Sequence, residues 1–98
     1  MIRTSNNKCR EYVESLTEFK ANNIFSEKIT KDKLYIVYSY GYHFPIYMKY
    51  KNTWYENTDK YSVSTSKHQS QARPYNFKRK LINTSKMKEI IRKSIYTS

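Results

Sequence analysis

Two histidines and one arginine are the residues of this 98-residue chain that could carry acid–base chemistry. His68 and Arg73 lie in a stretch rich in hydroxyl and amide side chains, Asp59–Pro74, whereas His43 lies in a separate turn region. A histidine can accept or donate a proton near neutral pH, and an arginine can hold a phosphate electrostatically. One hypothesis is therefore a small metal-independent nuclease that uses His43, His68 and Arg73. The alternative is that these side chains cap helix ends and satisfy buried backbone groups.

The positive charge is concentrated in the C-terminal third. Residues 67–98 contain nine Lys or Arg and one acid, Glu89, a net charge of +8 out of +11 for the whole chain. Residues 1–32 contain six basic and five acidic residues. Such a surface attracts polyanions, because each neutralised phosphate releases condensed counterions. The predicted nucleic-acid-binding residues are Lys67, Arg73, Tyr75, Lys78, Arg79, Lys80, Lys86, Lys88, Arg92 and Lys93. A solvated, solubilising surface or an acidic protein partner would account for the same charge.

Aromatic side chains form a third candidate feature. Eight tyrosines, one phenylalanine and one tryptophan fall between Tyr35 and Tyr61. Rings on a sheet can stack on nucleic-acid bases, which is worth roughly 1–3 kcal/mol per base. Tyr42, Trp54 and Tyr75 are the expected stacking residues. The alternative is that most of these rings form the core and ordinary cross-strand pairs.

Cysteine and hydropathy restrict the remaining classes. The single cysteine, Cys9, cannot form a disulfide within the chain, and it excludes a zinc site built from several cysteines. We expect no metal and no cofactor. No run reaches the ~18 apolar residues of a membrane span, and the mostly polar start over residues 1–8 leads into no apolar secretory core. We therefore expect no membrane partner and a cytoplasmic location.

Two helices are expected to position these residues. Apolar residues spaced as on one helical face predict a helix over residues 8–20, with a stripe that ends at Leu16 and Phe19. A second helix is predicted over residues 85–96, with Met87, Ile90 and Ile91 on its apolar side. One or two helical turns are expected within residues 64–71, ending before Pro74.

Between the two helices the sequence predicts antiparallel strands over residues 34–40 and 46–50, with a third beginning at Trp54. Gly41 is expected to adopt the positive φ of the first turn. Ile24 and Phe25 are expected to be an apolar anchor in a loop. The predicted fold is α+β: a three-stranded antiparallel β-meander with the N-terminal and C-terminal helices packed on one face. The chain is expected to be a single domain, with a core over residues 1–74 and a basic helical extension over residues 75–98.

Several motifs between residues 19 and 74 resemble a small domain family of unknown function that recurs in bacteriophages and other mobile elements. The motifs are Tyr38-Ser39-Tyr40-Gly41, His43-Phe44-Pro45, Trp54, Asn57, Asp59-Lys60-Tyr61-Ser62, Thr65-Ser66-Lys67-His68-Gln69-Ser70-Gln71 and Arg73-Pro74. The resemblance implies a compact α+β fold and a phage, prophage or plasmid origin, so the cytoplasm would be that of a bacterial host. It implies no catalytic role for any residue.

These observations lead to one principal hypothesis and two alternatives. The first is a small non-enzymatic accessory protein of a phage or mobile element that binds nucleic acid with low sequence specificity. The second is an inhibitor of a host defence complex, of the anti-CRISPR or anti-restriction type, whose partner would be acidic or bound to nucleic acid. The third is the nuclease built on His43, His68 and Arg73.

Overall fold

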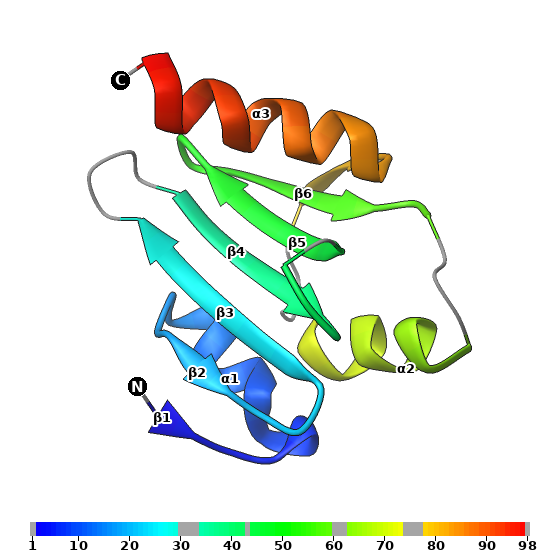
Figure 1. Ribbon diagram of the computed structural model, residues 1–98. Helices are drawn as coiled ribbons and strands as arrows, with labels where there is room; N and C mark the ends of the chain where they lie inside the picture. The colour runs from blue at the N-terminus through cyan, green and yellow to red at the C-terminus, as the bar shows by residue number, and fades with distance from the viewer. Residues whose placement is uncertain (1, 30–33, 43, 60–62, 74–77, 98) are drawn as a thin grey trace.

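The computed structural model describes residues 2–29, 34–42, 44–59, 63–73 and 78–97. They form one seven-stranded sheet with helices on both faces (Figure 1). The strands are β1 (Ile2–Arg3), β2 (Phe19–Lys20), β3 (Ile24–Ile29), β4 (Leu34–Ser39), β5 (Pro45–Tyr50), β6 (Thr53–Asn57) and β7 (Arg79–Ile82). The helices are a 3₁₀ turn η1 (Asn6–Lys8), α1 (Cys9–Glu14), α2 (Val63–Ala72) and α3 (Thr84–Thr97).

The strands lie in the sheet in the same order as in the chain, β1 to β7. The four pairings between β2 and β6 are antiparallel, whereas β1 with β2 and β6 with β7 are parallel. Each parallel pairing is made possible by a helical crossover: η1 and α1 connect β1 to β2, and α2 lies between β6 and β7. The sheet is therefore mixed, with an antiparallel centre and parallel edges.

β4 is the centre of the core, because all six of its residues are buried. Tyr35 and Val37 contact the cluster beneath α1 and α2, and Leu34 and Ile36 contact the cluster beneath α3. This is the two-residue alternation of a strand that is covered on both faces. Burial on both faces explains why the sequence of β4 is a nearly continuous apolar and aromatic run.

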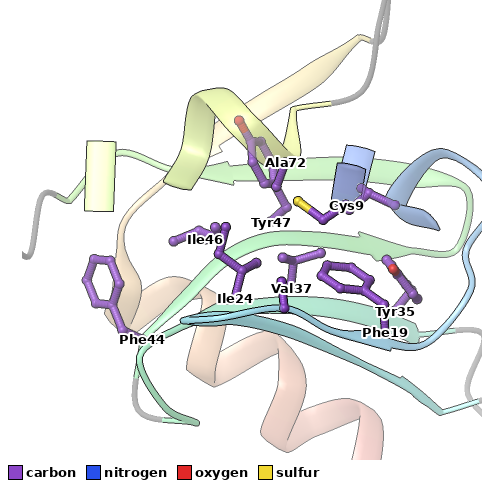
Figure 2. Close-up of a cluster of buried hydrophobic side chains, with 11 residues drawn as sticks. Cys9, Phe19, Ile24, Tyr35, Val37, Phe44, Ile46, Tyr47 and Ala72 are labelled. Atoms are coloured by element: carbon purple, nitrogen blue, oxygen red, sulfur yellow. The ribbon is translucent and has the colours of Figure 1, made fainter. Parts of the chain in front are cut away.

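The cluster on the α1 and α2 side is shown in Figure 2. Its buried members are Cys9, Val13, Phe19, Ala21, Ile24, Tyr35, Val37, Phe44, Ile46, Tyr47 and Ala72. Burial raises the pKa of the Cys9 thiol to about 11, and this thiol donates a hydrogen bond to the Gln71 carbonyl oxygen at 3.7 Å. Burial likewise raises the pKa of Tyr47 to about 12, so that its neutral hydroxyl donates to the Gln69 carbonyl oxygen at 2.8 Å. Polar groups at the edge of this cluster thus fasten α2 to the sheet.

α3 covers the opposite face of the sheet (Figure 1). Met87 is fully buried there, and Ile90 and Ile91 are partly buried against the same cluster. The helix predicted over residues 85–96 is confirmed, and the turns predicted over residues 64–71 lie within α2.

The predicted architecture, however, is wrong. The sheet has seven strands in place of a three-stranded meander, and the N-terminal and C-terminal helices lie on opposite faces. The three predicted strands correspond to β4, β5 and β6. The remaining strands have too few residues, or too mixed a composition, to show an alternating pattern in the sequence. Ile24 and Phe25, expected in a loop, begin the six-residue strand β3.

The helix predicted over residues 8–20 is also wrong in extent, because α1 ends at Glu14. Leu16 adopts a left-handed conformation with φ of 56°, and the amide of Thr17 donates to the Tyr12 carbonyl oxygen at 2.8 Å. This arrangement is the helix-ending motif that usually has glycine at the left-handed position. Phe19 lies in β2 but packs into the same core cluster as Cys9 and Val13 of α1. Its position in the sequence therefore fits the helical spacing although it is not in the helix.

The turn between β4 and β5 departs from the prediction in one respect. No described glycine has a positive φ, and Tyr40, which precedes Gly41, adopts the left-handed conformation with φ of 68°. The Tyr40 amide donates to the Asn23 carbonyl oxygen at 2.8 Å. A contact with the β2–β3 turn thus supports a conformation that tyrosine would otherwise disfavour.

Asn57, at the end of β6, joins four separate segments. Its side-chain Nδ2 donates to the Pro45 carbonyl oxygen at 2.7 Å and to Thr84 Oγ1 at 2.8 Å. Its carbonyl oxygen accepts from Gln69 Nε2, and its Oδ1 accepts from the Asp59 amide, both at 2.8 Å. The residue is 1% exposed. β5, α2 and the start of α3 are therefore held by one buried residue.

We expect Asn57→Ala to lower the free energy of unfolding by about 2–4 kcal/mol, because the Pro45 carbonyl oxygen, Thr84 Oγ1 and the Asp59 amide lose their side-chain partner at once. Urea denaturation measures this loss. Asn23→Ala is the matched control, because Asn23 is exposed, and it should change stability by less than about 0.5 kcal/mol. Equal stability of the two variants would contradict the role assigned to Asn57.

Candidate nucleic-acid interface

The outer surface of α3 carries the clearest group of exposed cations. Because Met87, Ile90 and Ile91 face the sheet, Lys88 and Arg92 lie on the exposed part of the helix. These two residues are four positions apart, so they are neighbours on the helix surface. Like charges at this spacing repel each other weakly in the free protein. A bound phosphate would remove that repulsion.

The other two cations of α3 are partly neutralised. Glu89 lies 3.1 Å from Lys93 and 3.9 Å from Lys86. The hydrogen bond from Lys93 and the charge of Lys86 hold the pKa of Glu89 below its usual range. Exposed ion pairs of this kind contribute little to stability, but they reduce the charge available to a ligand. Of the four predicted phosphate-binding residues on α3, Lys88 and Arg92 are therefore the stronger candidates.

β7 and the residue before it contribute a second set of cations at the edge of the sheet. Lys78, which precedes the strand, and Arg79 and Lys80 within it are all exposed. β7 and the first turns of α3 also flank an open hollow of about 510 Å³, lined by Leu81, Ile82 and Lys86 among others. The two segments are therefore adjacent along one side of the molecule.

Glu56 neutralises two of the predicted phosphate-binding residues. Its Oε1 lies 2.8 Å from Arg79 Nε and 3.6 Å from Arg73 Nε. Arg73 also donates a hydrogen bond to the Tyr47 hydroxyl at 3.1 Å, a contact that raises the pKa of the guanidinium. Arg73 and Arg79 thus act partly as ion-pair partners that join α2, β6 and β7. The only indication of these ion pairs in the sequence was Glu56, a single acidic residue in the strand that precedes the basic region.

His68 is a structural residue in this arrangement. The residue is 5% exposed, and its Nδ1 forms a hydrogen bond with Ser39 Oγ at 2.8 Å. Ser39 is itself fully buried, and the Tyr40 ring lies 5.1 Å from the imidazole ring. A substrate cannot reach the contacting atoms of this serine–histidine pair without opening the protein. His43 and Tyr75 lie outside the described residues, so neither is placed relative to His68.

The aromatic side chains lie mostly in the interior. Tyr35, Tyr38 and Tyr47 are buried, and helices cover both faces of the sheet. Trp54 is partly buried against Tyr35, at 6.4 Å between ring centroids. Tyr42 is 66% exposed and contacts the rings of Phe25 and Tyr38 edge-on, both at 5.0 Å. Of the predicted stacking residues, Tyr42 is the one that the structure places at the surface.

Lys67 lies apart from the other predicted residues. It is exposed on α2, on the side of the sheet opposite α3, and it lines a hollow near the N-terminus. The predicted set of ten residues therefore falls on at least two surfaces, which a linear count of charge could not separate.

Within the described part of the chain, no group of three metal-ligating side chains comes together. No helix in the described ranges has both the length and the apolar character required to cross a membrane. The chain matches no protein-family model, no curated protein and no solved structure. Membership of the phage and mobile-element family therefore stays a prediction.

We expect the stability of the protein to fall as the pH is lowered, because of His68. Burial, and to a lesser degree the charge of Lys67, lower the pKa of His68 below its ordinary value of 6.5. The unfolded chain therefore binds the proton more readily than the folded protein does. The stabilisation is present above the unfolded pKa of about 6.5 and is lost as the pH falls through the folded pKa.

This dependence is best measured in a His43→Gln background, where His68 is the only remaining histidine. Urea denaturation at pH values between about 5 and 8 should show the loss of stability. Adding His68→Gln should remove most of the change within this range. A pH dependence that persists in the double variant would contradict the assignment to His68.

Glu56→Gln should increase the affinity for duplex DNA and reduce stability by about 1 kcal/mol. The substitution removes the charge that neutralises Arg73 and Arg79, and both arginines are exposed enough for solvent to screen the loss. Fluorescence anisotropy and urea denaturation measure the two effects. Glu11→Gln, on the exposed surface of α1, is the charge-matched control. An equal gain in affinity from both variants would mean that only net charge matters.

Proposed function

We propose that this protein binds nucleic acid through the exposed cations of α3 and β7, with low sequence specificity and without catalysis. The observation that carries the proposal is the outward position of Lys88 and Arg92 on a helix whose other side is buried. Among the described residues, none of the ion pairs within 4.0 Å involves Lys80, Lys88 or Arg92. A rigid helix that presents cations beyond ion-pair distance of any described carboxylate is suited to phosphate contact rather than base readout.

Charge of this size also supports the proposal. The net charge of +11 for 98 residues is above the magnitude that solubility requires of a small domain. The exposed cations of α3 and β7 would neutralise several phosphates. Binding should then weaken steeply as salt is added. In this proposal the protein is an accessory protein of a phage or other mobile element acting in the bacterial cytoplasm.

The test is fluorescence anisotropy of labelled single-stranded DNA, duplex DNA and RNA over a series of salt concentrations. The double variant Lys88→Gln/Arg92→Gln should weaken duplex binding at ~100 mM salt by at least tenfold. It should also reduce the magnitude of the log–log salt slope by about 2, because each lost phosphate contact removes about 0.9. Its melting temperature should not fall, because the substitution removes a repulsive i, i+4 pair.

The matched control is Lys8→Gln/Lys28→Gln, which removes two exposed lysines elsewhere on the surface. The control should change the affinity by less than about threefold. Equal losses in both double variants would mean that net charge, and not the α3 surface, carries the binding. The absence of binding by the wild-type protein at ~100 mM salt would overturn the proposal.

A second candidate function is inhibition of a host protein, and Leu81 favours it. This apolar side chain is 59% exposed on the edge strand β7, next to the exposed cation Lys80. An exposed apolar side chain on an edge strand that also carries cations suits contact with an acidic protein surface. Binding to one host protein that persists at high salt and is lost in Leu81→Ser would favour this function over nucleic-acid binding.

A further inference from the structure

The sheet face that carries α3 is only partly covered by that helix. α3 packs mainly on β5 and β6, so the described helices leave much of β1, β2 and β3 open on this face (Figure 1). Phe25 of β3 is paired with Tyr38, whose side chain belongs to the cluster beneath α3, so Phe25 lies on the same face. Lys20 is paired with Phe25, and Arg3 with Lys20. One row across four strands therefore presents two cations and two aromatic rings on one face.

Three aromatic rings form a cluster at the end of this row. Phe25 stacks on Tyr38 at 5.1 Å between ring centroids, and Tyr42 contacts both rings edge-on at 5.0 Å. Tyr38 is buried, whereas Tyr42 is 66% exposed. A ring that rests on two others and is largely open to solvent offers a surface on which a further ring can stack. We call the surface formed by these rings with Arg3 and Lys20 the β1–β3 face.

The turn between β4 and β5 holds Tyr42 in this position. The Tyr40 amide donates to the Asn23 carbonyl oxygen at 2.8 Å, and the left-handed conformation of Tyr40 reverses the chain there. The two tyrosines of the turn consequently lie on different sides of the sheet. The Tyr40 ring lies against His68 of α2, and the Tyr42 ring lies against Phe25. Tyr42 is thus already placed before a ligand arrives, which lowers the entropy lost on binding.

Lys20 and Arg3 supply positive charge beside the aromatic cluster. Because neighbouring strands are about 4.8 Å apart, their backbones lie roughly 5 and 10 Å from that of Phe25. Among the described residues, none of the ion pairs within 4.0 Å involves either cation. Like charges directly opposite each other on neighbouring strands repel. An anion that contacts both side chains would relieve this repulsion.

One acidic residue, Glu27, lies on the same side of β3, two positions after Phe25. Burial, with a smaller contribution from the charge of Glu27, raises the pKa of Tyr38, so this carboxylate lies near the aromatic cluster. Two cations and one acid leave this part of β1, β2 and β3 with little net positive charge. Charge alone would attract a polyanion only weakly, so the rings must supply much of the affinity.

We propose that the β1–β3 face binds single-stranded nucleic acid, with a base stacked on Tyr42 and neighbouring phosphates at Lys20 and Arg3. In a duplex the bases are stacked on one another, whereas each base of a single strand has a face that an aromatic side chain can reach. The inference rests on the proposed function, because the ligand is again a nucleic acid. It adds a second surface that selects single strands.

Fluorescence anisotropy of the full chain with a labelled oligothymidylate of ~12 nucleotides tests the proposal, since single-strand binders cover about 4–16 nucleotides. An abasic strand of the same length carries the same phosphates without bases. The wild-type protein should bind the oligothymidylate at least about fivefold more tightly than the abasic strand, the smallest factor expected from one stacked base. Tyr42→Leu should remove this preference. Tyr42→Phe should keep it, because stacking requires the ring and not the hydroxyl.

Tyr40→Leu is the matched control, because Tyr40 is an exposed tyrosine of the same turn whose ring lies on the other side of the sheet. It should leave the preference within about twofold of the wild-type value. Lys20→Gln is a second test in a different element. It should reduce the magnitude of the log–log salt slope for the oligothymidylate by about 0.7, the value for one phosphate contact on a single strand. Lys28→Gln, an exposed lysine on the opposite side of β3, should not.

A labelled duplex separates failure of this proposal from failure of the α3 proposal. Equal binding of the two single strands by the wild-type protein, or a preference that Tyr42→Leu leaves unchanged, would overturn the β1–β3 site without affecting duplex binding through α3. An equal loss of duplex binding in folded Tyr42→Leu protein would also overturn it. If Lys88→Gln/Arg92→Gln retains both duplex affinity and the preference for bases, the α3 proposal fails and the β1–β3 site stands.

Discussion

β4 is buried on both of its faces, and this burial dictates how the other strands and helices are arranged. A strand with no exposed residue requires a covering layer on each side, and a 98-residue chain has few helices to supply them. α1 and α2 together cover one face, and α3 alone covers the other. Residues in the basic C-terminal region are thus part of the core as well as the surface. Met87 shows this most directly, because it is fully buried within the most basic third of the chain.

The three helices are short, and hydrogen bonds from buried polar residues hold two of them, α2 and α3, on the sheet. Asn57 connects β5, α2 and α3. Tyr47, on the sheet side, donates a hydrogen bond to the Gln69 carbonyl oxygen of α2. Asp59 accepts from the Thr84 amide at 2.9 Å, which places a carboxylate at the start of α3. The polar stretch that suggested an active site is therefore largely a set of satisfied structural hydrogen bonds. His68 belongs to this set through Ser39.

The same packing divides the positive charge into surfaces of different kinds. On α3, an exposed helix presents Lys88 and Arg92, whereas Arg73 and Arg79 are drawn to Glu56. At the far edge, β1 and β2 place Arg3 opposite Lys20. Net charge alone does not show which of these cations are paired with a carboxylate or on which part of the molecule each one lies.

Local residue patterns were enough to predict the strongly periodic elements and the chemical character of the surface. The apolar runs of β4 and β5 and the stripe of α3 are local patterns, and they were predicted correctly because burial on a strand or helix repeats with a fixed period. The number of strands, the sheet face that each helix covers and the partner of each cation depend on contacts between residues that are distant in the chain. A two-residue strand such as β1 has no period to read, and the left-handed Leu16 that ends α1 is stabilised by contacts rather than by its residue type. Whether a lysine or arginine is free for a ligand depends on which carboxylate folding brings beside it. Glu56 and Arg79 are 23 positions apart in the chain, so their ion pair exists only once β6 and β7 have joined.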